Sequence, residues 1–264
     1  MELVITSDWH SDWSTYGVPR WRDVERAVYA SVEHAVNIGA GGYLFGGDLA
    51  DPDTGGASYR SSGLAIDVAA HLSKAKIPSV WIRGNHDVYE DGSGASTLTP
   101  LAMAAKHFPG VYVAEEPRLF GVWKDLAVLC LPFMPVSHGV DMELTADVLW
   151  PESGLHSPGC DLEKECSCGA SEKPPPRVLV LSHLTVPGIH PGTETTEMPR
   201  GREILYPFTA TRRAAFRVQG HYHERQLFSP PPGEGVELII PGSLARLAFG
   251  EEDHEPGFLV LDVG

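Results

Sequence analysis

Strands and helices alternate regularly over the first third of the sequence, and this alternation limits the folds that the chain can adopt. Short β-rich apolar runs at 3–7, 42–45 and 79–82 are separated by two segments of helical periodicity, at 21–38 and roughly 63–75. In the first helical segment, apolar or small residues recur every three or four positions. This β-α-β-α-β order predicts a parallel sheet with right-handed crossover connections.

The second half of the sequence consists mainly of short β-like runs. They read LAVLCL, RVLVLS, AFRVQ, ERQLF, VELII and GFLVLDV. Neither an internal repeat nor a clear linker divides the chain of 264 residues, of which 42% are hydrophobic. We therefore predict one α/β domain over residues 1–264, built from two packed β-sheets flanked by helices.

Side chains that can bind metal ions follow five of the predicted strands. In open α/β sheets, sites form beyond the carboxyl ends of the strands, so we expect these side chains to meet at one edge. Glycines beside several of them permit tight turns. The residues are Asp8, His10, Asp48, Asn85, His86, His183, His221 and His223.

The types of these side chains indicate the chemistry of the site. Carboxylates, imidazoles and one amide oxygen suit two divalent ions, with Mn²⁺ expected first and Fe or Zn²⁺ as alternatives. One carboxylate can bridge two ions, and Asp48 is the candidate for this role. Two ions about 3.5–4 Å apart activate water and hold phosphoryl oxygens during in-line attack. His221 and His223 lie two residues apart after a strand, so we expect each to serve one of two neighbouring ions.

The ordered motifs DWH, GGD, GNHD, SH and GHYH resemble those of the calcineurin-like metallophosphoesterase superfamily. The resemblance implies a four-layer αββα fold, and it implies that His86 lies beside the scissile phosphate without binding metal. The ligands implied for one ion are Asp8, His10, Asp48 and His223. Those implied for the second ion are Asp48, Asn85, His183 and His221.

Longer segments resemble the SbcD-type branch of DNA-end nucleases. They read TSDWH, LSHLTVPG, GHYHERQ and IIPGSLARLAFGEEDHEPGFLVLDV. This resemblance implies hydrolysis of phosphodiester bonds, with DNA or a nucleotide as substrate. Chains of that branch usually continue into a capping region and a segment that binds an ATPase partner, whereas this sequence stops at Gly264. Some relatives also carry a further histidine shortly after the GGD aspartate, and here Asp48 is followed by Leu49, Ala50 and Asp51. These departures argue against an ATPase partner subunit.

Two alternative functions remain open at this level. The same metal pair would serve a phosphodiesterase of small or cyclic nucleotides, or a phosphomonoesterase. The formal charge of −15, from 20 basic and 35 acidic residues, disfavours non-specific binding to nucleic acid and favours a small substrate. No basic leader or run of about 20 apolar residues is present, so we expect no membrane span and a cytoplasmic location.

Acidic residues near the motifs have alternative interpretations. Asp87, next to His86, either orients that imidazole, which makes it a candidate catalytic residue, or caps a turn. Arg246 could either reach a phosphate or pair with Glu251 or Glu252, and we expect the pair.

Three cysteines and a histidine gather within a possible insertion at 151–176. They form either a structural Zn²⁺ site or a loop with free thiols. The four residues are His156, Cys160, Cys166 and Cys168. The remaining cysteine, Cys130, lies in an apolar run and is predicted to be a buried small hydrophobe.

Overall fold

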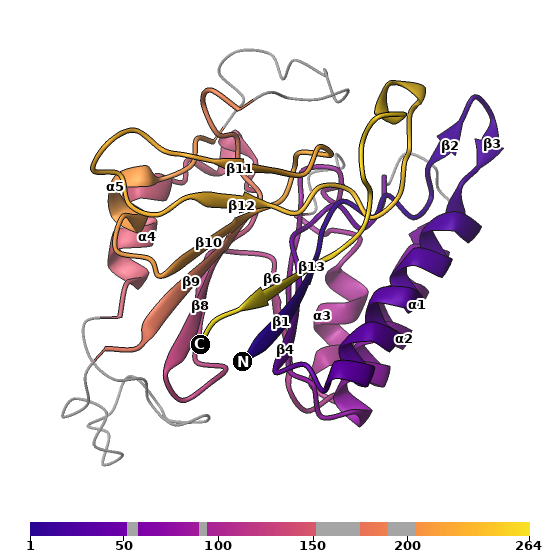
Figure 1. The fold of residues 1–264 in the computed structure, drawn as a ribbon, viewed down its shortest axis with the longest axis horizontal. Helices are drawn as coiled ribbons and strands as arrows, with labels where there is room; N and C mark the ends of the chain where they lie inside the picture. Colours follow the sequence, from indigo (N-terminus) through magenta and orange to yellow (C-terminus); the bar gives the residue numbers. More distant parts are fainter. Residues whose placement is uncertain (52–57, 90–93, 152–174, 190–203) are drawn as a thin grey trace.

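Two β-sheets pack face to face, and helices cover the outer face of each (Figure 1). The structure is a computed structural model that describes residues 1–51, 58–89, 94–151, 175–189 and 204–264. Its four layers of helix, sheet, sheet and helix confirm the predicted fold class. Among the described residues, no helix combines the length and the apolar character that a membrane span requires.

The first sheet has five strands in the order β13-β1-β4-β5-β6. Its strands are β1 (Glu2–Thr6), β4 (Gly42–Phe45), β5 (Ser79–Ile82), β6 (Val111–Ala114) and β13 (Leu259–Asp262). The four strands β1, β4, β5 and β6 run parallel, and β13 joins β1 in the antiparallel direction. The parallel β-α-β-α-β unit expected from the sequence is therefore present, and its strand ends point to one edge.

Three helices cover the outer face of this sheet. They are α1 (Trp21–Ile38), α2 (Ser58–Lys74) and α3 (Thr99–Ala105). The prediction placed the start of α2 at about Gly63, five residues too late. Its early turns carry Ser61 and Ser62, which are buried and bonded to Ser11 Oγ and Thr97 O. Apolar periodicity does not reveal such polar buried turns.

The second sheet has six strands in the order β11-β12-β10-β9-β8-β7. They are β7 (Arg118–Phe120), β8 (Leu126–Leu131), β9 (Arg177–Ser182), β10 (Phe216–Gln219), β11 (Gln226–Phe228) and β12 (Leu238–Ile240). The inner strands β8, β9, β10 and β12 are parallel. Helices α4 (Met142–Leu149) and α5 (Phe208–Thr211) share the buried cluster on the outer face.

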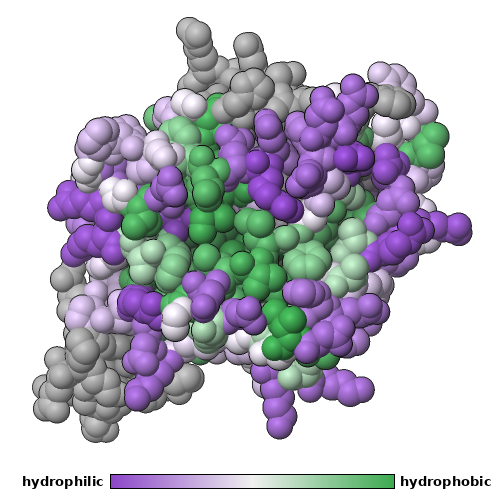
Figure 2. All heavy atoms as spheres, viewed as in Figure 1, coloured by the Kyte–Doolittle hydropathy of each residue, from purple (hydrophilic) through white to green (hydrophobic). Residues whose placement is uncertain are grey.

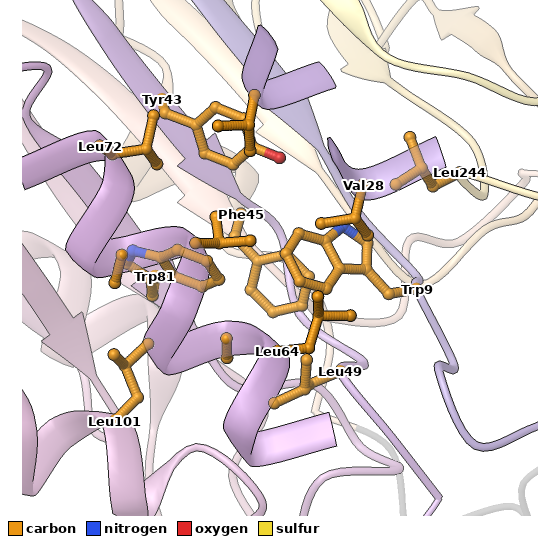
Figure 3. Packing of buried hydrophobic residues seen from close by; sticks show 14 of the residues in the cluster. Trp9, Val28, Tyr43, Phe45, Leu49, Leu64, Leu72, Trp81, Leu101 and Leu244 are labelled. Carbon is orange, nitrogen blue, oxygen red and sulfur yellow. The ribbon is translucent and has the colours of Figure 1, made fainter. Parts of the chain in front are cut away.

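Alternating residues of each strand point to opposite faces, so each sheet contributes to two cores. Leu3 and Ile5 of β1 belong to the cluster between the sheets, together with Cys130, which is buried as predicted. Figure 3 shows the core between the first sheet and its helices, where the Trp9 ring lies 4.7 Å from Phe45, measured between centroids. Because Trp9 is anchored in this core, the segment that follows β1 is held in place.

A hairpin and two 3₁₀ turns connect the main strands and helices. A hairpin of β2 (Ser14–Thr15) and β3 (Val18–Pro19) leads into α1. The 3₁₀ turn η2 (Val136–His138) precedes α4, and η4 (Phe249–Glu251) lies between β12 and β13. Trp13 Nε1 and Thr15 Oγ1 donate to Leu247 O at 3.0 and 2.5 Å, so the hairpin and the η4 segment lie against each other (Figure 1).

Candidate metal centre

The predicted ligands come from the carboxyl ends of strands in both sheets. Asp8, Asp48 and Asn85 follow β1, β4 and β5 of the first sheet. From the second sheet, His183 follows β9, and His221 and His223 follow β10. The face-to-face packing of the sheets brings these two sets of strand ends to one place.

Two groups of buried or half-buried side chains form there. In each group, one potential ligand atom per residue lies within 4.8 Å of the others. The first group is Asp8, His10 and His223. The second group is Asp48, His183 and His221. Each has the mixture of carboxylate and imidazole that first-row divalent metals accept.

The two groups touch each other through Asp48. Its Oδ2 lies 3.7 Å from His10 Nε2 of the first group and 3.2 Å from His183 Nε2 of its own group. Asn85 Oδ1 joins the second group, at 3.0 Å from His183 Nε2 and 2.9 Å from His221 Nδ1. The side chains therefore form one continuous cluster around a central carboxylate.

The spacing of two imidazoles in the first group matches that of ligands on one ion. His10 Nε2 and His223 Nε2 are 3.2 Å apart. Two nitrogens bound to one ion at about 2.0–2.1 Å with a tetrahedral angle lie roughly 3.3 Å apart. This convergence of nitrogen atoms is the geometry that a metal ion would require.

Four residues of the cluster have left-handed backbone conformations, which are uncommon outside glycine. Such strained residues persist where surrounding structure holds them, and they gather at functional sites. They are Asp8 (φ 52°), His10 (φ 40°), Asp48 (φ 58°) and His221 (φ 79°).

Glycines permit the close approach of the strand ends. A Cβ atom on Gly84 would lie 2.0 Å from Asp48 Oδ1, and one on Gly220 would lie 2.3 Å from Gly46 O. Any larger residue at these two positions would push the ligand-bearing turns apart.

The electrostatics of the cluster are those of a cation site. Burial raises the pKa of Asp8 to about 7, an effect that His183 opposes and Asp48 reinforces. Burial also acts to raise the pKa of Asp48, but the imidazoles of His183 and His86 hold it well below its usual value. The buried atom Asp8 Oδ2 has no hydrogen-bond donor among the described residues, and Asp48 Oδ2 is approached by the imidazole nitrogens of His183 and His10 without a well-formed hydrogen bond. Divalent cations would supply the partners that these oxygens lack.

His86 lies at the edge of the cluster, where it is partly exposed. Its imidazole lies 5.0 Å from that of His10, measured between ring centroids. His86 Nδ1 lies 3.5 Å from Asp51 Oδ2, and both side chains are about one-quarter exposed, at 25% and 26%. Asp51 follows the GGD motif, and the sequence predicts no role for it because its distance from His86 along the chain hides the contact.

Of the two roles predicted for Asp87, orienting the His86 imidazole and capping a turn, the structure supports the second. Its fully buried carboxylate accepts hydrogen bonds from the Thr97 hydroxyl and from four backbone N–H groups. The N–H donors belong to Asp48, Leu49, Ala50 and Gly84. Asp87 thus ties the turn after β4 to the turn after β5, so the structure favours the turn cap over the catalytic assignment.

The predicted ion pair of Arg246 with Glu251 or Glu252 is not present among the described residues. Arg246 donates to His254 O through Nε and Nη2, at 3.0 and 2.9 Å. Glu251 instead accepts from His223 Nδ1 at 2.8 Å and, through Oε2, from Leu247 N at 2.6 Å. Burial acts to raise the pKa of Glu251, but these hydrogen bonds bring it below its usual value. Carboxylates in this position orient histidines that bind metal.

The cysteine-rich segment lies outside the described residues. The structure therefore says nothing of the zinc site predicted from His156, Cys160, Cys166 and Cys168. The candidate centre described above uses none of these residues.

Comparison with known proteins gives a family match and similar folds. The family model for calcineurin-like phosphoesterases matches residues 1–225. A dimetal phosphatase from Danio rerio is similar over 98% of this chain and 91% of its own, with 14% identity and a TM-score of 0.54. Yfce, a phosphoesterase from E. coli, aligns over 100% of this chain and 89% of its own, with 13% identity and a TM-score of 0.40. The search of curated proteins gives no match.

Proposed function

The chain belongs to the calcineurin-like phosphoesterase family, and from this premise we propose that it hydrolyses phosphodiester bonds with two divalent metal ions. The observation that carries the proposal is the pair of ligand groups joined by Asp48. The family uses a dinuclear centre of divalent metals, and the oxygen- and imidazole-rich cluster suits that chemistry.

We assign the ligands by their positions in the cluster. Asp48 would be the ligand shared by the two ions, because its carboxylate lies beside both groups. The remaining ligands of one ion are Asp8, His10 and His223. The remaining ligands of the other are Asn85, His183 and His221. When bound, such a pair activates a water molecule and neutralises charge on the phosphoryl oxygens.

His86 provides the proton for the leaving oxygen. Asp51 Oδ2 lies 3.5 Å from Nδ1 of its imidazole, and we assign the donated proton to Nε2. The partial exposure of both side chains gives a substrate access to this position.

The preference for diesters rests on the SbcD-like segments. One of them, the turn Pro241-Gly242-Ser243, contacts the backbone of a proposed ligand, since Ser243 N donates to His223 O at 3.0 Å. A phosphomonoesterase and a phosphodiesterase of cyclic nucleotides are the alternatives, because the same metal pair can serve all three reactions.

Two chromogenic substrates test the proposal. Bis-p-nitrophenyl phosphate should be hydrolysed faster than p-nitrophenyl phosphate. EDTA should abolish both activities, and Mn²⁺ should restore them best, because carboxylate and imidazole ligands dominate the cluster. Faster turnover of the monoester would favour the phosphatase alternative, and full activity in metal-free protein would contradict the mechanism.

Replacement of Glu251 by glutamine should lower the affinity for the ion that His223 would bind more than the affinity for the other ion. Glu251 fixes the orientation and basicity of His223, and loss of such a partner typically costs about 10–100-fold in metal affinity. Calorimetric titration with Mn²⁺, together with elemental analysis, would resolve the two affinities. Glu252→Gln is the matched control, since Glu252 is the exposed neighbour. Equal weakening of both ions would contradict the assignment.

A further inference from the structure

Arginine and aromatic side chains lie on the turn of the β2–β3 hairpin and on the first turns of α1 and α2. We define the arginine–aromatic surface as Tyr16, Trp21, Arg22, Tyr59 and Arg60. We propose that this surface binds single-stranded nucleic acid and leads it to the metal centre. The inference rests on the proposed phosphodiesterase function and names the substrate class.

Stacking on one indole ring holds the two arginines of the surface together. Arg60 Cζ lies 4.3 Å from the centroid of the Trp21 ring, and Arg22 Cζ lies 5.0 Å from it. Guanidinium groups stacked on an aromatic ring keep their N–H donors available at the edge, where a phosphate can bind them. Trp21 therefore arranges two phosphate-binding groups in advance.

Neither arginine pairs with a carboxylate of the described residues, although the protein is acidic overall. Arg20 and Arg26 lie 2.9 and 4.0 Å from the carboxylate of Asp23. In contrast, no carboxylate within the described part of the chain forms a salt bridge with Arg22 or Arg60.

The local charge differs from that of the whole chain. In a chain of net charge −15, two adjacent arginines that pair with no described carboxylate create a local positive potential, because salt screens the more distant carboxylates. Asp23 and Glu25, which lie on the same helix as Arg22, reduce this potential without pairing with Arg22. Figure 2 shows mostly hydrophilic side chains along the margin where Figure 1 places the start of α1.

Two exposed tyrosines provide flat surfaces for bases. Tyr16 is 87% exposed and Tyr59 is 85% exposed. Exposure of large aromatic rings next to arginines is typical of proteins that bind single strands, in which bases stack on the rings and the cationic groups follow the backbone. Duplex DNA would require many more phosphate contacts than two free arginines can supply.

The surface is connected to the metal centre at two points. On the α2 side, Arg60 precedes Ser61, whose hydroxyl contacts Ser11 Oγ at 2.7 Å. Ser11 follows the proposed ligand His10 directly. On the hairpin side, the Trp13 ring lies 5.9 Å from that of His10, measured between centroids. Ser11 and Ser61 are buried, so these contacts hold the elements that carry the surface close to the centre. A strand bound at the surface could thus reach the centre with a neighbouring phosphate, whereas a cyclic mononucleotide has no further phosphate to place there.

Binding of a labelled oligonucleotide tests the inference. Fluorescence anisotropy of a 12-nucleotide oligothymidine would be measured with the full chain in EDTA, so that no cleavage occurs. Arg22→Gln with Arg60→Gln should weaken binding at least tenfold and lower the slope of log affinity against log salt by about 1.4. Tyr59→Ala should weaken it roughly five- to hundred-fold.

Arg118→Gln is the matched control. Arg118 is also an exposed arginine stacked on a ring, 5.4 Å from the centroid of Phe120, but it lies on β7. The Arg118→Gln variant should bind the oligonucleotide as the unchanged protein does. The thermal midpoint and Mn²⁺ content of each variant would show that the fold and the centre are intact.

The outcomes separate this inference from the proposed function. If the unchanged protein hydrolyses bis-p-nitrophenyl phosphate but the double arginine variant binds the oligonucleotide as Arg118→Gln does, the inference is wrong and the proposed function stands. If binding depends on the arginines but no metal-dependent diesterase activity exists, the proposed function is wrong and the surface stands. Competition by cyclic AMP as strong as that by unlabelled oligothymidine would overturn the assignment of a polynucleotide.

Discussion

Replacement of Asp48 by asparagine should cause the largest loss of activity of any single ligand change. Asparagine tolerates the positive φ of 58° at this position, and its side-chain oxygen can still accept the hydrogen bond that His86 N donates to Asp48 Oδ1 at 2.9 Å. The backbone is thus preserved while the bridging charge is removed. Because bound metal stabilises the transition state by several kcal/mol, we expect kcat to fall by about 10³-fold.

The comparison with His10 makes this test specific. His10→Asn removes a ligand of one ion only, so it should leave more activity and more bound Mn²⁺ than Asp48→Asn does. Metal content by elemental analysis and kcat on bis-p-nitrophenyl phosphate would be measured on the same samples. Asp253→Asn, an exposed position, serves as the control for a lost carboxylate. A greater loss in His10→Asn would show that Asp48 does not bridge the ions.

Replacement of His86 by asparagine should lower kcat without removing metal. His86 lies beside the ligand groups and contacts Asp51, so its proposed task is to protonate the leaving oxygen. General acid catalysis typically contributes about 10²–10⁴-fold, and we expect a loss in that range. The loss should be smaller for nitrophenolate, a good leaving group, than for an alkoxide leaving group such as that of a dinucleotide.

Two further variants define this role of His86. Asp51→Asn should lower kcat less than His86→Asn, because Asp51 acts through the imidazole. His107→Asn, at an exposed histidine, should behave as the unchanged protein. Loss of Mn²⁺ in His86→Asn, or an equal effect on good and poor leaving groups, would show that His86 is not the acid.

The elements of the fold that depend on local pattern were predictable from the sequence. The runs that form β1, β4, β5, β8 and β9 are apolar. Four of them are followed by glycine or polar residues that stop a strand, and β8 stops before Pro132. The periodicity of residues 21–38 likewise gave α1 with its observed bounds. The side chains of the metal centre could also be predicted from the sequence, because parallel strands bring their carboxyl ends to one edge of a sheet.

The partners of these side chains depended on contacts between distant segments. Asp87 is the neighbour of His86 in sequence, yet its carboxylate is turned into the core and bonded to backbone N–H groups. Asp51, which lies after a different strand, reaches the imidazole instead. Glu251 approaches His223 across 28 residues, a contact that no local pattern encodes.

The distribution of charge was also decided by the tertiary structure. The sequence determined the net charge of −15, and this number alone argued against nucleic acid. The packing of α1 beside α2 places Arg22 and Arg60 over the same indole ring, while Asp23 engages Arg20 and Arg26. Composition fixes how many charges a chain carries, but the packing of helices fixes which charges are neutralised, because ion pairs and stacking act only over a few ångströms.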